Sequence, residues 1–108
     1  MQYPPAEKIA VHGSGRAMLV RGQWVPLGPK QGIILQILLQ TPGQVVRKET
    51  IADRVWGRPV TSSLIAVHIH YLRKKLELDA DRPKILLTLP GVGFVLSTGA
   101  ADFDVSSG

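Results

Sequence analysis

The first third of the chain alternates short apolar runs with turn residues. The runs are rich in residues that favour β-strands, and glycine-containing turns separate them. They are Lys8–His12, Ala17–Val20 and Trp24–Leu27. This spacing predicts an antiparallel meander of short strands. Residues 1–7, which contain two prolines, offer room for one further strand beside it.

Three helices are predicted to follow. The first has Gly28 as its cap and Pro29 at its first position, a place that proline favours, and its apolar stripe continues through Gln31–Gln40. After it, Val45-Val46 is interpreted as a two-residue apolar bridge. The second helix is short, Lys48–Gly57, and a proline at position 59 prevents it from continuing.

The third predicted helix has two contrasting faces. It begins after Thr61-Ser62-Ser63, whose hydroxyls suit a helix cap, and runs to about Leu78. One stripe at helical spacing is apolar and is expected to face the core: Ile65, Ile69, Leu72 and Leu76. The opposite face mixes a cation, hydrogen-bonding groups and an apolar group: Val67, His70, Tyr71 and Lys74. That mixture suits a DNA major groove, and the plain alternative is a solvated amphipathic helix.

A hairpin is predicted at the end of the domain. The runs Ile85–Thr88 and Phe94–Ser97 flank a turn at residues 89–93. A short helix, a turn, a longer basic helix and then a hairpin is the winged-helix order. The expected fold is therefore α+β: a winged helix-turn-helix with an N-terminal antiparallel sheet, three helices and a C-terminal β-hairpin wing. This domain should span residues 1–98, with a flexible tail over residues 99–108.

Composition narrows the classes of function. A chain of 108 residues makes one domain, and the absence of cysteine excludes disulfides and thiolate chemistry within it. With 13 basic and 8 acidic residues the net charge is +5, which points to nucleic acid, an anionic membrane or an acidic protein as partner. No apolar run is long enough to span a bilayer, and the first residues lack a signal-peptide layout. We therefore expect a cytoplasmic protein.

The remaining chemistry-bearing residues have structural interpretations. His68 and His70 project from different sides of a helix and cannot hold one metal. The acidic residues, Glu77 among them, are expected on helical surfaces and in a loop, so no acid–base pair is indicated. The large aromatic residues are interpreted as core anchors: Trp24, Trp56 and Phe94. We expect no enzyme activity, metal or cofactor.

Four motifs, in order and at the right spacing, resemble the OmpR/PhoB-type winged-helix DNA-binding domain, the effector half of many two-component response regulators. They are Val45-Val46-Arg47-Lys48-Glu49, Val55-Trp56-Gly57, Val67-His68-Ile69 with Leu72-Arg73-Lys74-Lys75-Leu76, and Thr88-Leu89-Pro90-Gly91-Val92-Gly93-Phe94. The resemblance covers roughly residues 8–98. It implies a four-stranded N-terminal sheet, a third helix in the major groove and a wing in the minor groove. It also implies head-to-tail homodimers on direct DNA repeats and contact with RNA polymerase through the Arg58–Ser62 loop.

This chain departs from the family pattern on the expected DNA face. Arg47 stands where the family usually has a capping serine, and Pro90 stands where the wing usually carries an arginine. The third helix opens Ser63-Leu64-Ile65-Ala66-Val67-His68, without the usual first arginine and the usual acid. His70 and Tyr71 occupy positions that are often basic, and the Arg58–Ser62 loop is shorter than usual.

Together these features predict sequence-specific binding of double-stranded DNA in transcription regulation. Base edges should be read by the exposed face: Val67, His70, Tyr71 and Lys74. Phosphates should be held by the flanks of that face: His68, Arg73 and Lys75. Pro90 and Val92, in the wing, should brace the neighbouring groove. The alternative is a winged-helix module for protein interaction, with weak or no specific DNA binding.

Overall fold

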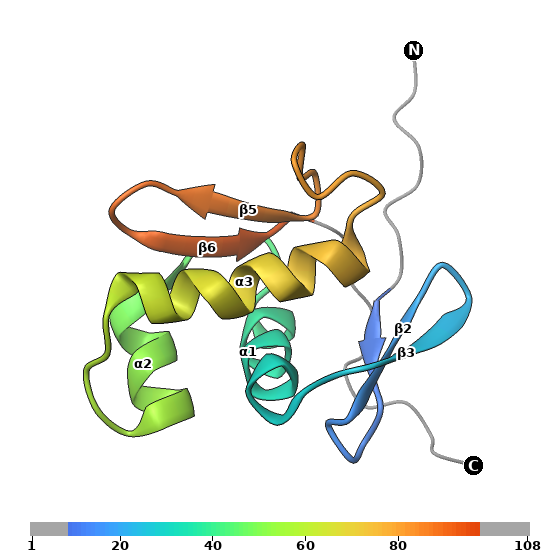
Figure 1. The fold of residues 1–108 in the computed structure, drawn as a ribbon, viewed down its shortest axis with the longest axis horizontal. Coiled ribbons are helices and arrows are strands. Elements are labelled where there is room, and N and C mark those ends of the chain that lie inside the picture. Colours follow the sequence, from blue (N-terminus) through green and yellow to red (C-terminus); the bar gives the residue numbers. More distant parts are fainter. Residues whose placement is uncertain (1–8, 98–108) are drawn as a thin grey trace.

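The computed structural model describes residues 9–97 and has the predicted order of elements (Figure 1). These are β1 (Ala10–Val11), β2 (Ala17–Val20), β3 (Gln23–Pro26), α1 (Pro29–Gln40), β4 (Val46–Arg47), α2 (Lys48–Trp56), α3 (Ser62–Leu76), β5 (Leu86–Leu89) and β6 (Gly93–Leu96). In Figure 1, α3 lies between the β5–β6 hairpin and α1, with α2 toward one end and the N-terminal sheet toward the other. The predicted winged helix-turn-helix is confirmed.

The N-terminal sheet pairs β1, β2 and β3 in antiparallel order. The β2–β3 turn consists of Arg21 and Gly22, whose φ angles of 49° and 76° are the left-handed pair that a tight hairpin needs. Met18 and Val20 point from β2 into the core and are buried. The described residues thus contribute three strands here, and the further strand expected in residues 1–7 lies outside them, as does the expected tail.

Helix α1 packs closely against the first hairpin because Gly32 has no side chain. A Cβ at Gly32 would lie 2.1 Å from the carbonyl oxygen of Gly15, a distance that no real contact tolerates. Pro29 is the first helical residue and Gly28 is the cap, as predicted. Gln31 Oε1 accepts a hydrogen bond from the Gly28 backbone N–H at 3.2 Å, which fixes this end of the helix.

The second sheet contains a strand that the sequence pattern does not reveal. Val46–Arg47 is a strand, β4, rather than an apolar bridge, and the sheet order is β4-β6-β5. The pairing of β4 with β6 depends on Gly93, where a Cβ would lie 2.0 Å from the Val46 carbonyl oxygen. A strand of two residues is too short to show alternation, so periodicity alone does not identify it.

The ends of helices α2 and α3 follow simple local rules. Helix α2 ends at Gly57, which has a left-handed φ of 70°. Helix α3 begins after Thr61, whose Oγ1 accepts a hydrogen bond from the Leu64 N–H at 3.2 Å, which confirms the predicted hydroxyl cap. The helix ends at Leu76, before the predicted end at Leu78, because Glu77 turns to extended backbone with ψ 147°.

One hydrophobic core joins both sheets and all three helices. The four stripe residues of α3 are only 0–2% exposed, as predicted: Ile65, Ile69, Leu72 and Leu76. Phe94 is buried and Trp56 packs partly buried against the core, which confirms two of the three aromatic anchors. The interpretation of Trp24 is wrong: it is 46% exposed, because it lies across from Leu19 rather than beside the inward-pointing Met18 and Val20.

Candidate nucleic-acid interface

The face of α3 that points away from the core is exposed and chemically mixed. Val67 is 47% and Tyr71 48% exposed, and His70 and Lys74 are exposed as well. The rings of His70 and Tyr71 lie 5.8 Å apart between their centroids. The structure therefore gathers all four sequence-predicted base-reading residues on one surface.

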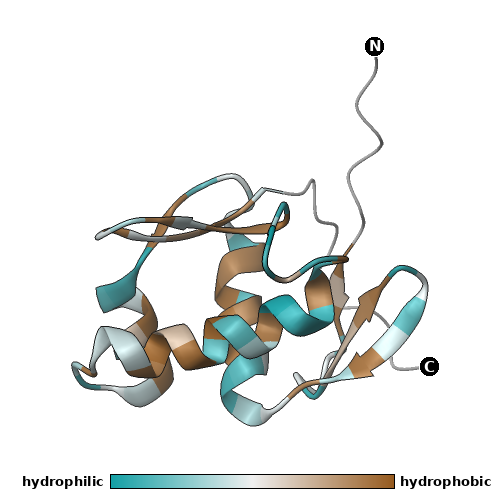
Figure 2. Cartoon of the chain, turned by 45° about the horizontal axis from the view of Figure 1, so that its top comes forward, coloured by the Kyte–Doolittle hydropathy of each residue, from teal (hydrophilic) through white to brown (hydrophobic). Residues whose placement is uncertain are grey.

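The β5–β6 hairpin forms a largely apolar wing beside this helix. Figure 2 shows mostly hydrophobic residues along the two strands and hydrophilic residues in the loop between α3 and β5. Gly91, with φ 76°, makes the tight turn at the tip. Pro90 and Val92 are both exposed there, and the Val92 N–H donates to the Leu89 carbonyl at 3.0 Å. The tip thus presents apolar side chains rather than a cation.

Arg73 connects α3 to the wing. Its Nε donates to the Leu86 carbonyl at 2.9 Å, and its Nη2 donates to Thr88 Oγ1 at 2.6 Å. Burial lowers the pKa of Arg73, and the nearby Glu77 carboxylate acts in the opposite direction. Two of its donor groups are therefore engaged within the protein, and only its remaining N–H groups are available to a phosphate.

Glu77, the residue that follows the last residue of α3, binds the same strand. It is only 6% exposed, contrary to the expectation of a surface acid. Its carboxylate accepts hydrogen bonds from the backbone N–H groups of Lys84, Ile85 and Leu86 at 2.7–3.1 Å. Both backbone groups of Leu86 are thus bound by side chains four residues apart, Arg73 in α3 and Glu77 directly after it. The spacing from Arg73 to Glu77 is the only sequence signal for this arrangement.

The C-terminal end of α3 is tied to the N-terminal sheet. Lys75 Nζ donates to the Pro26 carbonyl and to Gln31 Oε1, both at 2.8 Å. Arg21 Nη1 donates to the Leu76 carbonyl at 2.7 Å. The ammonium of Lys75 therefore reaches toward β3 and α1, away from the wing flank that Arg73 occupies.

His68 lies at the edge of the core, as expected, on the side of α3 that faces α2. Its ring centroid is 5.4 Å from that of Trp56. Burial, and then the positive charge of Lys30, lower the pKa of His68, so the imidazole is held in its neutral form. A neutral imidazole keeps one N–H donor.

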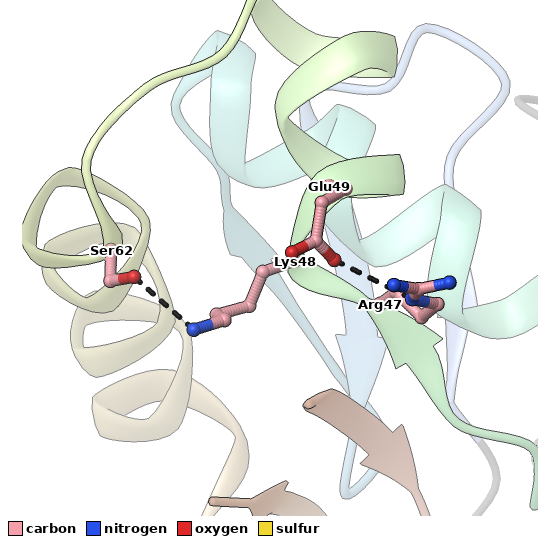
Figure 3. A network of polar contacts seen from close by, with 4 residues as sticks. All are labelled: Arg47, Lys48, Glu49 and Ser62. Atoms are coloured by element: carbon pink, nitrogen blue, oxygen red, sulfur yellow. Dashed lines mark hydrogen bonds and ion pairs between the residues drawn. The ribbon is translucent and has the colours of Figure 1, made fainter. Parts of the chain in front are cut away.

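Lys48 occupies a position that sequence analysis misses. Its Nζ donates to Ser62 Oγ at 3.3 Å in the first turn of α3 (Figure 3). Its backbone N–H donates to the Val92 carbonyl at 3.1 Å in the wing tip. On the other side of Lys48, Arg47 Nε pairs with Glu49 Oε1 at 3.5 Å, and Arg47 gives α2 no side-chain cap. The pairing of β4 with β6 places this cation between the helix and the wing.

The described residues 9–97 contain no cluster of three or more histidine, cysteine or acidic side chains suited to a metal ion. Over the same residues, none of the helices combines the length and hydropathy that a membrane span requires.

Comparison with known proteins extends this picture. A family model described as "Transcriptional regulatory protein, C terminal" matches residues 22–96. The chain is 36% identical over 77 residues to a probable transcriptional regulatory protein of a Picosynechococcus species, which covers 69% of this chain and 31% of that protein. The chain spans about a third of the length of the curated relatives it matches.

Two solved structures share the fold. The response regulator DrrB of Thermotoga maritima, an OmpR/PhoB homolog, superposes with a TM-score of 0.70 at 30% identity, over 78% of this chain and 39% of that one. The DNA-binding domain of CpxR from E. coli gives a TM-score of 0.73 at 26% identity, over 93% of this chain and 100% of that one. The family match, the shared motifs and the fold agree: this chain belongs to the OmpR/PhoB-type family of C-terminal domains of transcriptional regulatory proteins.

Proposed function

We propose that this chain binds double-stranded DNA sequence-specifically, as the effector domain of a bacterial transcriptional regulator in the cytoplasm. Helix α3 lies in the major groove and the β5–β6 wing reaches the neighbouring minor groove. The observation that carries the proposal is the exposed face of α3, held beside the wing by fixed hydrogen bonds. We call this surface the reading face, and its residues that contact base edges are Val67, His70, Tyr71 and Lys74.

The net charge of the chain and its similarity to a DNA-binding domain support this proposal. The net charge of +5 favours a polyanion, and one of the similar structures is by its own description a DNA-binding domain. The role we infer is binding, without catalysis, metal or cofactor.

The contacts to phosphate are assigned from the geometry. Lys48 stands between α3 and the wing tip, and Arg73 and His68 lie on the two flanks of the reading face. We assign phosphate contacts to these three. We assign no phosphate contact to Lys75, because its ammonium is bound to β3 and α1. Its proposed role is to support the helix.

Salt dependence tests the proposal directly. Affinity for a random-sequence duplex should fall steeply with salt, because binding releases counterions from the phosphates. Replacing Lys48 with alanine should reduce the slope of log affinity against log salt by about 0.9, the value for one phosphate contact. Arg82→Ala is the matched control, since this exposed cation lies in the loop between α3 and β5. An absence of binding at low salt would refute DNA binding.

Two further partners belong to the proposal. Family resemblance supports a head-to-tail homodimer on direct repeats, and sedimentation on duplexes with one or two half-sites tests it. The Arg58–Ser62 loop is exposed except for the half-buried Val60, which suits contact with RNA polymerase. Arg58→Ala should then lower transcription in a reconstituted system without lowering DNA affinity.

A second function is favoured by one specific observation. Three large apolar residues on the reading face and the wing tip are 43–48% exposed: Val67, Tyr71 and Val92. Such surface is also suited to a protein partner. The salt titration separates the two functions, because a protein-interaction module would not bind random DNA at low salt.

A further inference from the structure

The reading face of α3 carries an apolar stripe along its length. Leu64, Val67 and Tyr71 follow one another at helical spacing and are 37%, 47% and 48% exposed. The wing tip adds Leu89 and Val92, which are 38% and 43% exposed. These are large side chains to leave in water, so their partner should offer apolar groups.

The side chains that usually read guanine and adenine are missing or engaged elsewhere. Guanine is typically bound by arginine or lysine and adenine by asparagine or glutamine, each through two hydrogen bonds. Helix α3 contains no asparagine or glutamine. The only arginine in the helix, Arg73, is bound to Leu86 and Thr88, and Lys75 is bound to β3 and α1. Of its three cations, only Lys74 belongs to the reading face.

The major groove presents one apolar group to a protein, the C5 methyl of thymine. We propose that this domain recognises its DNA sites mainly through thymine methyl groups, packed against Leu64, Val67 and Tyr71, so that its target is rich in A·T pairs. This inference rests on the proposed DNA-binding function and names the class of DNA sequence that it serves. His70 and Lys74, beside the stripe, supply the few polar base contacts.

The wing fits the same class of target. Residues 89–92 carry no charge at the tip, so the wing offers the minor groove van der Waals contact rather than a cation. The ammonium of Lys48 lies at the first turn of α3 instead, 3.3 Å from Ser62 Oγ, while its backbone N–H binds the Val92 carbonyl. Electrostatic attraction to DNA then comes from phosphate contacts. Discrimination among DNA sequences comes from the shape of the groove and from thymine methyl groups.

Deoxyuridine isolates the methyl group, because it pairs as thymine does and lacks only that group. A binding site is first selected from a random duplex pool, and each thymine is then replaced singly by deoxyuridine. Affinity should fall about fourfold for each contacted methyl, as expected for burial of one methyl-sized group. Conversely, 5-methylcytosine in place of cytosine at a contacted position of a weak site should recover part of the affinity.

Two variants assign the contact to the helix. Val67→Ala should abolish the difference in affinity between thymine and deoxyuridine duplexes at one position of the site. The difference at the other positions should remain. Leu78→Ala removes a side chain that is 88% exposed and lies beyond the end of α3, so it should leave every difference unchanged.

The outcomes distinguish this inference from the function on which it rests. A selected site rich in G·C, equal affinity for thymine and deoxyuridine duplexes, or binding with no enriched sequence would overturn the inference and leave DNA binding intact. Unchanged discrimination in Val67→Ala would overturn the assignment to α3. Failure to bind any duplex at low salt would overturn both proposals.

Discussion

Three consecutive cations on α3 have three different environments. Arg73 binds the wing strand β5, Lys74 is exposed on the reading face, and Lys75 binds β3 and α1. In the sequence they form one basic run. Their roles therefore depend on the helix face from which each projects, and substitution should separate them.

Lys75→Ala is expected to lower stability without changing the salt dependence of DNA binding. The change removes hydrogen bonds from a charged donor to the Pro26 carbonyl and Gln31 Oε1, which should cost about 1 kcal/mol of unfolding free energy. Urea unfolding measures that loss, and a salt titration on random duplex measures the slope. A slope reduced as much as in Lys48→Ala would show that Lys75 contacts phosphate after all.

His68 should make stability depend on pH. Burial and Lys30 hold its pKa below the ordinary histidine value near 6.5, so the unfolded chain takes up the proton more readily than the folded one. The stabilisation from this residue is complete above about pH 6.5 and is lost as the pH falls through the lower folded-state pKa. Urea midpoints between neutral and mildly acidic pH should decrease, and His68→Gln should flatten that decrease. The same decrease in the variant would assign it to other groups.

The outer edge of β5 in the wing is bound to α3 and to Glu77 by side chains rather than to a further strand. In the sheet order β4-β6-β5, strand β5 is at the edge, and Arg73 and Glu77 bind the backbone groups of Leu86. An edge strand needs such partners for its outward N–H and C=O groups. The helix and the wing should therefore move together as one reading unit.

Glu77→Gln tests this attachment. A glutamine side chain has one acceptor oxygen where the carboxylate has two, and its NH₂ group would face backbone donors. We expect a loss of about 1–3 kcal/mol of unfolding free energy, as for other buried donors left without a partner. Hydrogen exchange at Lys84, Ile85 and Leu86 should become faster. Glu49→Gln, at a carboxylate that is 69% exposed, is the control and should change little.

Elements with strong periodicity or clear capping residues are predictable from this sequence, and those defined by tertiary contacts are not. The buried stripe of α3 and the Thr61 cap follow from helical spacing and local chemistry. Strand β4 exists only because Gly93 lets β6 approach it. Likewise, sequence spacing places Lys48, Arg73 and Lys75 on surfaces but does not give the partners that they bind.

Helix α3 is held along its length by the rest of the domain. Thr61 caps its start, Arg73 and Glu77 join its second half to the wing, and Arg21 binds the carbonyl of Leu76 at its end. Beneath these contacts, one core includes residues from both sheets and all three helices. The reading face is therefore as rigid as the fold, and the domain should unfold as a single cooperative unit.

Ile69→Ala tests that cooperativity. Ile69 is 1% exposed in the middle of α3, so truncating it should cost about 2–5 kcal/mol, a large part of the roughly 5–15 kcal/mol of a typical domain. In a domain of this size the melting temperature should fall by roughly 8 °C or more. Single-tryptophan variants retaining Trp24, on the N-terminal sheet, or Trp56, at the end of α2, report the two ends of the molecule separately. Both probes should show the same lowered midpoint, while Leu78→Ala, at an exposed position, should leave the midpoint within experimental error. If only the Trp56 transition moved, the N-terminal sheet would be an independent unit, and its contacts with Lys75 and Leu76 would not stabilise α3.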